Sequence, residues 1–304
     1  MGVLRIGRPN EMRRMAVAKG ILHTIENSMG GFSKGQKRIA GYILENCDKA
    51  AFMTASKLGK LVGVSESTVV RFASELGYDG YPSMQRALQE MIRSRLTSTQ
   101  RIQQAGELFE RQDVLGAVLQ SDMDKLRELV NQANRAQFHD VVDRIKNARH
   151  IYILGVRSSY FVAGYLNFYM HLLCENVTLV QSNAAGEIFE QLFRIGPGDV
   201  MIAISFPRYS KVTMNTVQFA QDRGATIIAV TDNELSPVYQ MSDAALLAPC
   251  EMLSFVDSMV APLSLMNALL VALAYRMGTD ISNTFAELEN IWNEYGVFGK
   301  MDDE

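Results

Sequence analysis

The sequence predicts a multi-domain chain, in which an all-α N-terminal domain precedes a doubly wound α/β domain with a five-stranded parallel sheet. Its 304 residues suffice for two domains of ordinary size. Helical patterning without any Val- or Ile-rich strand run extends from residue 20 to about residue 95. From residue 150 onwards, short apolar runs alternate with helix-like stretches, which is typical of βαβ units whose sheet is covered on both faces.

The domain boundaries follow from changes in composition along the chain. We expect a flexible leader at 1–19, a helical domain at 20–98, a connector at 99–135, the α/β domain at 136–275 and a C-terminal helical tail at 276–304. The connector begins with a polar stretch rich in Ser and Gln. It continues as an amphipathic helix, because apolar residues recur every three or four positions: Leu115, Val118, Leu119, Leu126, Leu129 and Val130.

Five apolar runs are the expected strands, and each is followed by Gly, Ser, Asp or Asn and then by helix-like sequence. They are Ile151–Leu154, Val177–Val180, Val200–Ile204, Thr226–Val230 and Ala244–Leu247. In a doubly wound sheet of order 2-1-3-4-5 the first and third strands are neighbours, and ligands bind where the strand order reverses. The loops after the first and third strands are therefore expected to meet at one site.

The net charge of −3 conceals an asymmetry between the two halves of the chain. Residues 1–100 hold 15 Lys and Arg against 8 Asp and Glu, whereas residues 101–304 hold 15 against 25. A basic domain joined to an acidic one is typical of nucleic-acid-binding proteins. Five of the basic residues belong to the leader, so the charge by itself is a weak indicator.

Several classes of protein are not expected. Met1–Lys19 is rich in Arg and Met and lacks a continuous apolar core, which argues against a secretory signal. The apolar stretch Met259–Tyr275 contains Pro262 and Asn267 and falls short of the ~20 residues of a membrane span, so we expect a buried helix and no membrane partner. The three cysteines are far apart and have neither metal-ligand nor disulfide spacing. We therefore expect a cytoplasmic protein without a metal site or a cofactor.

Residues 54–77 predict a helix-turn-helix. Leu58, Leu61 and Val62 give the first helix an apolar face. Gly63 ends it, since glycine adopts the left-handed conformation readily. Ser65 is placed to cap the second helix through its hydroxyl. The core-facing residues of the second helix are Val69, Phe72 and Leu76.

The second helix of such a motif enters the major groove of DNA with its N-terminus first. The candidate contacts to bases and phosphates lie at its start and on its outer face: Ser65, Glu66, Ser67, Thr68 and Arg71. Arg71 is the strongest candidate, because a guanidinium binds guanine or phosphate in a bidentate way. Lys57 and Lys60, on the preceding helix, suit backbone phosphates. The alternative is an ordinary αα-hairpin with polar outer positions.

Three motifs, in this order, resemble the N-terminal domain of the RpiR/MurR family of bacterial regulators. They are Ala40-Gly-Tyr-Ile-Leu-Glu-Asn46, Gly63-Val-Ser-Glu-Ser-Thr-Val-Val-Arg-Phe72 and Leu76-Gly-Tyr-Asp-Gly80. The resemblance covers about residues 22–98 and implies a helix-turn-helix domain that binds double-stranded DNA. A two-fold symmetric oligomer would read a pseudo-palindromic operator.

Two of the expected strand-to-helix turns carry hydroxyl groups and cations. Gly155-Val-Arg-Ser-Ser-Tyr160 follows the first strand, and Ser205-Phe-Pro-Arg-Tyr-Ser-Lys211 follows the third. Free N–H groups and the helix dipole favour an anion at a helix N-terminus. The candidate ligand-binding residues at these turns are Arg157, Ser158, Ser159, Ser205, Arg208, Tyr209, Ser210 and Lys211. The alternative is that the serines only cap helices.

This half of the chain, about residues 136–275, is similar to the SIS (sugar isomerase) domain, which completes the RpiR/MurR architecture. The resemblance implies that four hydroxyls hold the phosphate of a sugar, those of Ser158, Ser159, Ser205 and Ser210. The usual second loop reads Ser-x-Ser-Gly-x-Thr, whereas here Pro207 and Arg208 replace its second Ser and its Gly, and Ser210 replaces its Thr. Arg208 suits a phosphate or carboxylate of the ligand, or equally an acidic residue of the protein itself.

Three functions are compatible with these features. The first is a regulator, expected to be a repressor, whose operator affinity a sugar phosphate or related anionic metabolite controls through the connector helix. The second is a DNA-binding regulator whose α/β domain only dimerises; the long apolar face of Met259–Ala274 suits the interface of a dimer or tetramer.

The third is a phosphosugar isomerase. It needs a base and a second proton-transfer group, and Glu187 is the one candidate base, without an evident His or Glu partner. We therefore expect no enzyme and assign no catalytic residue. Glu187 lies near the same rim as the serine turns and joins the ligand-binding candidates, although a lone carboxylate is also typical of a solvated helix start.

Overall fold

The computed structural model describes residues 21–95, 99–102, 113–181, 185–250 and 254–298. The chain forms two compact units, Met1–Arg101 and Ile102–Glu304. The expected leader at 1–19 and most of the polar part of the expected connector, 103–112, lie outside the described residues. The amphipathic part of that connector belongs to the second unit.

Every regular element in the described residues of the first unit is a helix, as the sequence predicts. Its elements are α2 (Ile21–Ser28), the 3-10 turn η1 (Met29–Gly31), α3 (Lys34–Glu45), α4 (Cys47–Ala50), α5 (Ala55–Val62), α6 (Glu66–Glu75) and α7 (Tyr81–Arg95). A capping box begins α3: the Ser33 hydroxyl accepts from the Gln36 amide, and the Gln36 side chain accepts from the Ser33 amide. The core consists of apolar side chains from α2, α3, α5, α6 and α7, among them Ile25, Ile39, Ile43, Leu58, Phe72, Met84 and Leu88.

The second unit contains the parallel sheet that the sequence predicts. Its first elements are α9 (Val114–Gln132), α10 (Arg135–Lys146), β1 (Ile151–Gly155), α11 (Ser159–Leu173), β2 (Val177–Val180), α12 (Ala185–Gln191) and β3 (Val200–Ile204). They are followed by α13 (Lys211–Asp222), β4 (Thr226–Thr231), α14 (Pro237–Gln240), β5 (Ala244–Leu247), α15 (Val260–Met277) and α16 (Thr279–Glu294). The strands pair in the order β2-β1-β3-β4-β5, every pair parallel, which confirms the doubly wound arrangement.

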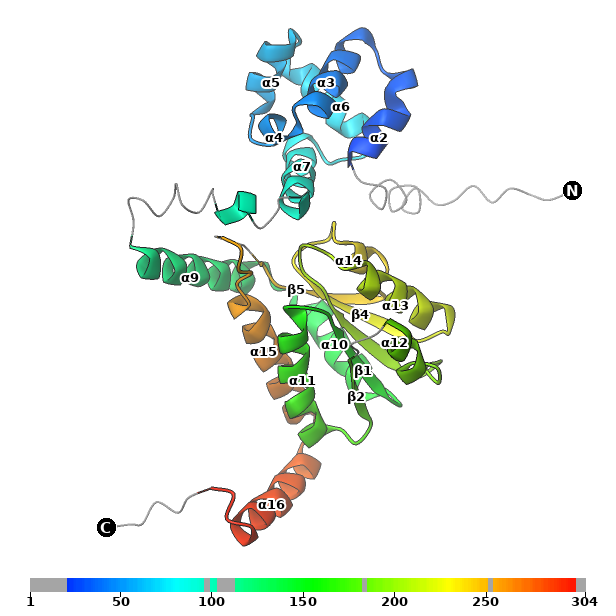
Figure 1. Cartoon of the computed structure of the whole chain (residues 1–304), viewed down its shortest axis with the longest axis vertical. Coiled ribbons are helices and arrows are strands. Elements are labelled where there is room, and N and C mark those ends of the chain that lie inside the picture. The colour runs from blue at the N-terminus through cyan, green and yellow to red at the C-terminus, as the bar shows by residue number, and fades with distance from the viewer. Residues whose placement is uncertain (1–20, 96–98, 103–112, 182–184, 251–253, 299–304) are drawn as a thin grey trace, which may run out of the picture. The chain divides into compact units, whose positions relative to one another are not determined.

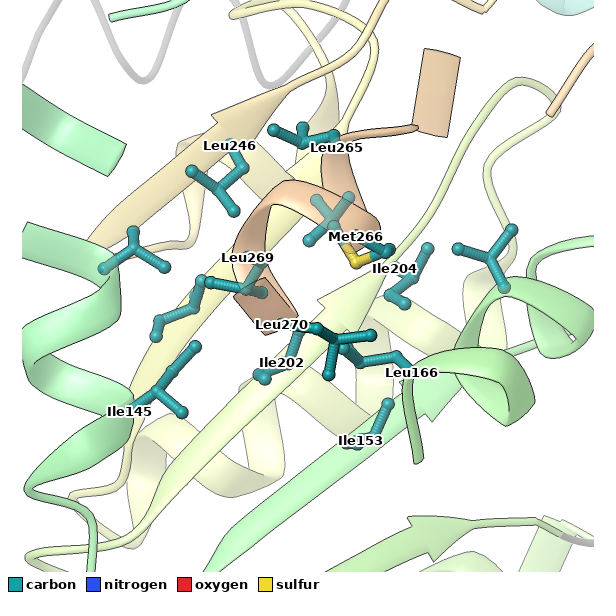
Figure 2. Close-up of a cluster of buried hydrophobic side chains, with 14 of the residues drawn as sticks. Ile145, Ile153, Leu166, Ile202, Ile204, Leu246, Leu265, Met266, Leu269 and Leu270 are labelled. Carbon is teal, nitrogen blue, oxygen red and sulfur yellow. The ribbon is translucent and has the colours of Figure 1, made fainter. Parts of the chain in front are cut away.

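Helices cover both faces of this sheet, because successive side chains of a strand point to opposite sides (Figure 1). On one face, Ile153 of β1 and Ile202 of β3 pack with α10, α11 and α15 (Figure 2). On the other face, Leu154 and Met201 pack with α12, α13 and α14. Strands buried on both sides explain why the sequence shows continuous apolar runs instead of alternation.

Helix α15 lies in the core, as expected for the apolar stretch from Met259. Its Leu265, Met266 and Leu269 are buried in the cluster of Figure 2, against the sheet. By length and composition alone, α15 is the one described helix that would suffice to cross a membrane. Its other face exposes Val271 and Tyr275, and it packs beside α11.

An ion pair joins the residues that precede β1 and β3, at the N-terminal ends of these strands. Arg149 donates two hydrogen bonds of 2.8 Å to the carboxylate of Asp199, whose side chain is 1% exposed. Burial opposes the ionisation of Asp199, but the hydrogen bonds from Arg149 and from the Gly196 amide outweigh it and hold the pKa of Asp199 below its ordinary value. This pair therefore stabilises the side of the sheet opposite to the strand-end loops.

The apolar face of α9 is present but largely uncovered. Leu115 is 68% exposed, Leu119 and Val130 are also exposed, and Leu129 is the buried member of the predicted stripe. The helix packs on α15, while its N-terminal half contributes no residue to the buried core. The 3.6-residue period predicted the helix correctly, but a period does not say what covers the apolar face.

Candidate DNA-binding and anion-binding sites

Helices α5 and α6 form the helix-turn-helix in the first unit. Gly63 ends α5 with φ of 68°, in the left-handed region where glycine is favoured. The Ser65 hydroxyl then caps α6 by accepting from the Thr68 amide, as predicted. The predicted core-facing residues of α6, Val69, Phe72 and Leu76, are all buried.

The buried face of α5 differs from the expected one. Leu61 is 55% exposed, whereas Ala55, Leu58 and Gly59 are buried. The reason is the close approach at Gly59, where a Cβ would lie 2.9 Å from the Val64 carbonyl oxygen of the turn. This contact rotates α5 so that the Gly59 side faces α6 and Leu61 faces solvent.

The outer surface of the α5–α6 pair presents the candidate DNA contacts. Ser65, Glu66, Ser67 and Arg71 are exposed, Thr68 is half-buried, and Lys57 and Lys60 on α5 are exposed. The Ser65 hydroxyl also lies 2.9 Å from that of Ser67 and 2.8 Å from that of Thr68, so the start of α6 carries a connected group of hydroxyls.

Two further residues lie at this surface. Val70, which is 38% exposed, stands on the outer face of α6 beside Arg71. Arg38 of α3 is exposed and places a guanidinium nitrogen 3.1 Å from where a Cβ of Gly63 would lie. The local motif gave no indication of Arg38, because α3 reaches the turn only through the tertiary fold.

The loops after β1 and β3 are neighbours in the second unit. Gly155 of β1 pairs with Ile204 of β3, so Val156 and Ser205 begin their loops side by side. The Ser205 amide donates to the carbonyl oxygen of Val230 in β4, which fixes the start of the second loop. The strand order that was assumed for the ligand site is therefore the observed one.

The first loop is held tightly between strand and helix. A Cβ on Gly155 would lie 2.5 Å from the Ser159 carbonyl oxygen and 2.8 Å from the Ala163 Cβ, so only glycine permits this approach of β1 to α11. Arg157 adopts φ of 59°, which is uncommon for a residue with a side chain and typical of constrained ligand loops. Ser159 is buried, whereas Ser158 is exposed and donates a 3.3 Å hydrogen bond to Asp257.

The second loop has one buried and several accessible polar residues. Ser205 is buried, and the Tyr209 hydroxyl donates to Asp232 at 2.9 Å. The Ser210 hydroxyl caps α13 by accepting from the Val212 amide, which is the structural role that the sequence left open for it. Arg208 and Lys211 are exposed.

Positive charge gathers on both loops. Within the part of the chain that the structure describes, no acidic residue pairs with Arg157, Arg208 or Lys211. Unpaired guanidinium and ammonium groups beside helix N-termini favour an anionic ligand. Glu187 is exposed in the first turn of α12, after β2, and 182–184 before it lie outside the described residues. Over the described ranges, no group of three His, Cys, Asp or Glu is arranged to hold a metal ion.

Two family models match the chain. The helix-turn-helix domain of the rpiR family matches residues 19–95, and the SIS domain matches residues 144–272. With the geometry of the two units, these matches define a DNA-binding transcriptional regulator composed of a helix-turn-helix domain and a SIS domain. Residues 19–95 therefore form a helix-turn-helix domain of the rpiR family, as the three N-terminal motifs indicated.

Curated relatives agree with this class of protein, and solved structures share its fold. An uncharacterized HTH-type transcriptional regulator of Haemophilus influenzae is 27% identical over 76% of this chain and 81% of its own length. The Vibrio vulnificus NanR protein complexed with ManNAc-6P matches with a TM-score of 0.57 and 23% identity, over 92% of this chain and 99% of that one. The sugar isomerase domain of an RpiR transcription factor from Sphaerobacter thermophilus matches with a TM-score of 0.55 and 26% identity, over 59% of this chain and 99% of that one.

Proposed function

We propose that the protein binds a pseudo-palindromic operator as a homo-oligomer and that an anionic metabolite of the sugar phosphate class controls this binding. In this proposal it is a cytoplasmic repressor and catalyses no reaction. The observation that carries the ligand part is the pairing of Gly155 with Ile204, which sets two cationic, hydroxyl-bearing loops side by side at the point where the strand order reverses.

The outer face of α6 reads the operator in this proposal. Arg71 contacts a base or a phosphate, and Lys57 and Lys60 contact backbone phosphates. With an operator isolated by selection from genomic DNA, Arg71→Ala weakens binding by about 1–3 kcal/mol and relaxes specificity at one base pair. Lys57→Ala weakens all sequences alike and lowers the salt dependence. Lys49→Ala on α4, outside the α5–α6 pair, is the matched control and leaves affinity unchanged.

The β1 and β3 loops bind the anion, with Ser158, Arg157 and Arg208 as the accessible groups. A thermal-shift panel of sugar phosphates, amino sugar phosphates including ManNAc-6P, polyol phosphates and sugar acids tests this assignment. A ligand at ~100 times its dissociation constant stabilises the fold by about 2.7 kcal/mol. The stabilisation disappears in Ser158→Ala and Arg208→Ala. If no compound of the panel raises the melting temperature while operator binding is intact, oligomerisation remains as the role of the second unit.

A homo-oligomer is supported by the adjacent helices α11 and α15. They pack together and expose large apolar side chains without a charged residue between them: Phe161, Phe168, Val271 and Tyr275. Depletion of charge and enrichment of aromatic residues mark the cores of protein interfaces. In sedimentation experiments Phe168→Asp dissociates the oligomer, whereas Phe193→Asp, an exposed phenylalanine in the layer on the opposite face of the sheet, does not.

A further inference from the structure

One short segment, residues 254–259, touches both the candidate anion site and helix α9. Asp257 accepts a 3.3 Å hydrogen bond from the Ser158 hydroxyl of the β1 loop. The next residue, Ser258, donates a 2.6 Å hydrogen bond to Asp122 in the middle of α9. Consecutive residues of one loop therefore hold the ligand loop and the helix through which the chain enters the second unit from the DNA-binding unit.

Asp257 competes with an anion for the same hydroxyl. Ser158 stands at the N-cap position of α11, but its side chain makes no capping hydrogen bond and donates to the carboxylate instead. An anion at the start of α11 needs a donor from this loop and is repelled by a neighbouring carboxylate. Anion binding and the Ser158–Asp257 hydrogen bond therefore exclude each other. The anion needs the same hydroxyl as a donor, and the negative charge of Asp257 repels it.

Ser258 is held in place by three hydrogen bonds. Its hydroxyl donates to Asp122 and accepts, at 3.5 Å, from the Val260 amide at the start of α15. Its carbonyl oxygen accepts from the Cys250 thiol at 3.4 Å. Because consecutive Cα atoms are separated by a rigid peptide unit, a displacement of Asp257 bears directly on these contacts.

Helix α9 packs on α15, and Leu129 is its buried apolar side chain. Its N-terminal half is exposed, and a cavity of about 590 Å³ lies where its C-terminal half meets α10, β5 and α15. Leu126 and Leu129 line this cavity from α9, and Leu265 lines it from α15. A helix that rests on an incompletely filled interface moves at a smaller cost in packing than a helix in a close-packed core.

We propose that Asp257 is the anion-sensing residue and that the Ser258–Asp122 hydrogen bond transmits its displacement to α9. Without the anion, Asp257 holds Ser158, and Ser258 holds α9. When the anion binds, Ser158 is released from Asp257, the 254–259 loop shifts, and α9 loses its hydrogen bond to Ser258. The inference rests on the proposed function, because it describes how the same anion site controls the helix that leads to the DNA-binding unit.

The test uses the full chain in phosphate-free buffer, with inorganic phosphate as the probe. Calorimetry measures phosphate affinity, and hydrogen exchange measures the amides of α9 around Asp122. Asp257→Asn removes a negative charge beside the anion and keeps an acceptor for Ser158, so it tightens phosphate binding about tenfold. Saturating phosphate speeds exchange in α9 of the unsubstituted chain about fivefold, the effect of losing one hydrogen bond.

Two variants separate transmission from binding. In Ser258→Ala the exchange of α9 is already fast without phosphate, and phosphate adds nothing further. Asp124→Asn, the same kind of change on an exposed carboxylate of α9 that bonds within the helix, is the control and behaves like the unsubstituted chain.

The outcomes distinguish this inference from the proposed function. Tighter phosphate binding in Asp257→Asn, together with the loss of the phosphate response in Ser258→Ala, would support the relay. Phosphate binding of unchanged strength in Asp257→Asn, or an α9 exchange rate that phosphate does not alter, overturns the relay while leaving the anion site in place. If the unsubstituted chain binds neither phosphate nor any member of the sugar phosphate panel, the anion site and the relay both fail.

Discussion

Gly155→Ala is the substitution that tests most sharply how the anion loop is built. Its added Cβ would lie 2.5 Å from the Ser159 carbonyl oxygen and 2.8 Å from the Ala163 Cβ, far inside ordinary contact distances. Both neighbours belong to the backbone or to the shortest of side chains, so neither can rotate away. Overpacking of this kind costs about 1–3 kcal/mol, and it also moves the start of α11, on which the anion loop depends.

Gly164→Ala in α11, the helix against which Gly155 of β1 packs, is the matched control. Apart from its chain neighbours and the backbone of its own helix, no atom lies within 4 Å of its Cβ position. Replacing a helical glycine by alanine there adds about 1 kcal/mol of stability through helix propensity. The free energies of unfolding of the two variants therefore differ by about 2–4 kcal/mol, in opposite directions from the unsubstituted chain.

Differential scanning calorimetry measures this difference. For a unit of the size of Ile102–Glu304, 1 kcal/mol corresponds to about 2–4 °C in Tm. Gly155→Ala lowers the Tm of the second unit and also abolishes its stabilisation by phosphosugars, while Gly164→Ala raises the Tm and retains that stabilisation. If Gly155→Ala is as stable as Gly164→Ala, the close approach of β1 to α11 is not a constraint and our account of the loop is refuted.

Three further substitutions give independent checks. Gly59→Ala destabilises the first unit by about 1–3 kcal/mol, because the added Cβ would lie 2.9 Å from the backbone of the turn. Gly41→Ala, with open space around it, is neutral or stabilising. If thermal unfolding shows the same stability for both variants, this prediction is wrong. Tyr81→Phe removes a 2.7 Å hydrogen bond to a backbone carbonyl oxygen and costs about 1 kcal/mol in urea denaturation, with no change in operator specificity. Asp199→Asn weakens the hydrogen bonds from Arg149 to a buried carboxylate and costs about 1.5–3 kcal/mol. Folding lowers the pKa of Asp199, so its carboxylate stabilises the fold at pH values above its pKa in the unfolded chain. This stabilisation is lost as the pH falls through the pKa of the folded chain. A difference in the free energy of unfolding between Asp199→Asn and the unsubstituted chain that stays unchanged down to pH ~2 would refute this.

The sheet was predictable because its strands are buried on both faces. All five residues of β3, Val200–Ile204, are buried, so the strand is a continuous apolar run that needs no partner to be recognised. The strand order 2-1-3-4-5 was assumed as one of the common doubly wound orders, and the structure has this order, so the loops after β1 and β3 are neighbours. The turn of the helix-turn-helix was equally local, since Gly63 and Ser65 act on their immediate neighbours.

Features that depend on tertiary approach were not predictable. The exposure of Leu61 follows from the contact between Gly59 and the turn, and the cation of Arg38 reaches the same turn from a different helix. Asp257 is separated from Ser158 by 99 positions in the sequence, and no local pattern connects them. Hydrogen bonds between distant loops are set by the packing of whole elements, so they become visible only in the folded chain.

The most direct test of the central claim is a titration of operator affinity by fluorescence anisotropy, with and without the best ligand of the sugar phosphate panel. We predict that the ligand changes operator affinity in the unsubstituted chain, that Arg71→Ala binds the operator weakly in either condition, and that Arg208→Ala binds it normally but no longer responds. An operator affinity that no anionic metabolite changes, or a response that persists in Arg208→Ala, would contradict the claim that the β1 and β3 loops control DNA binding.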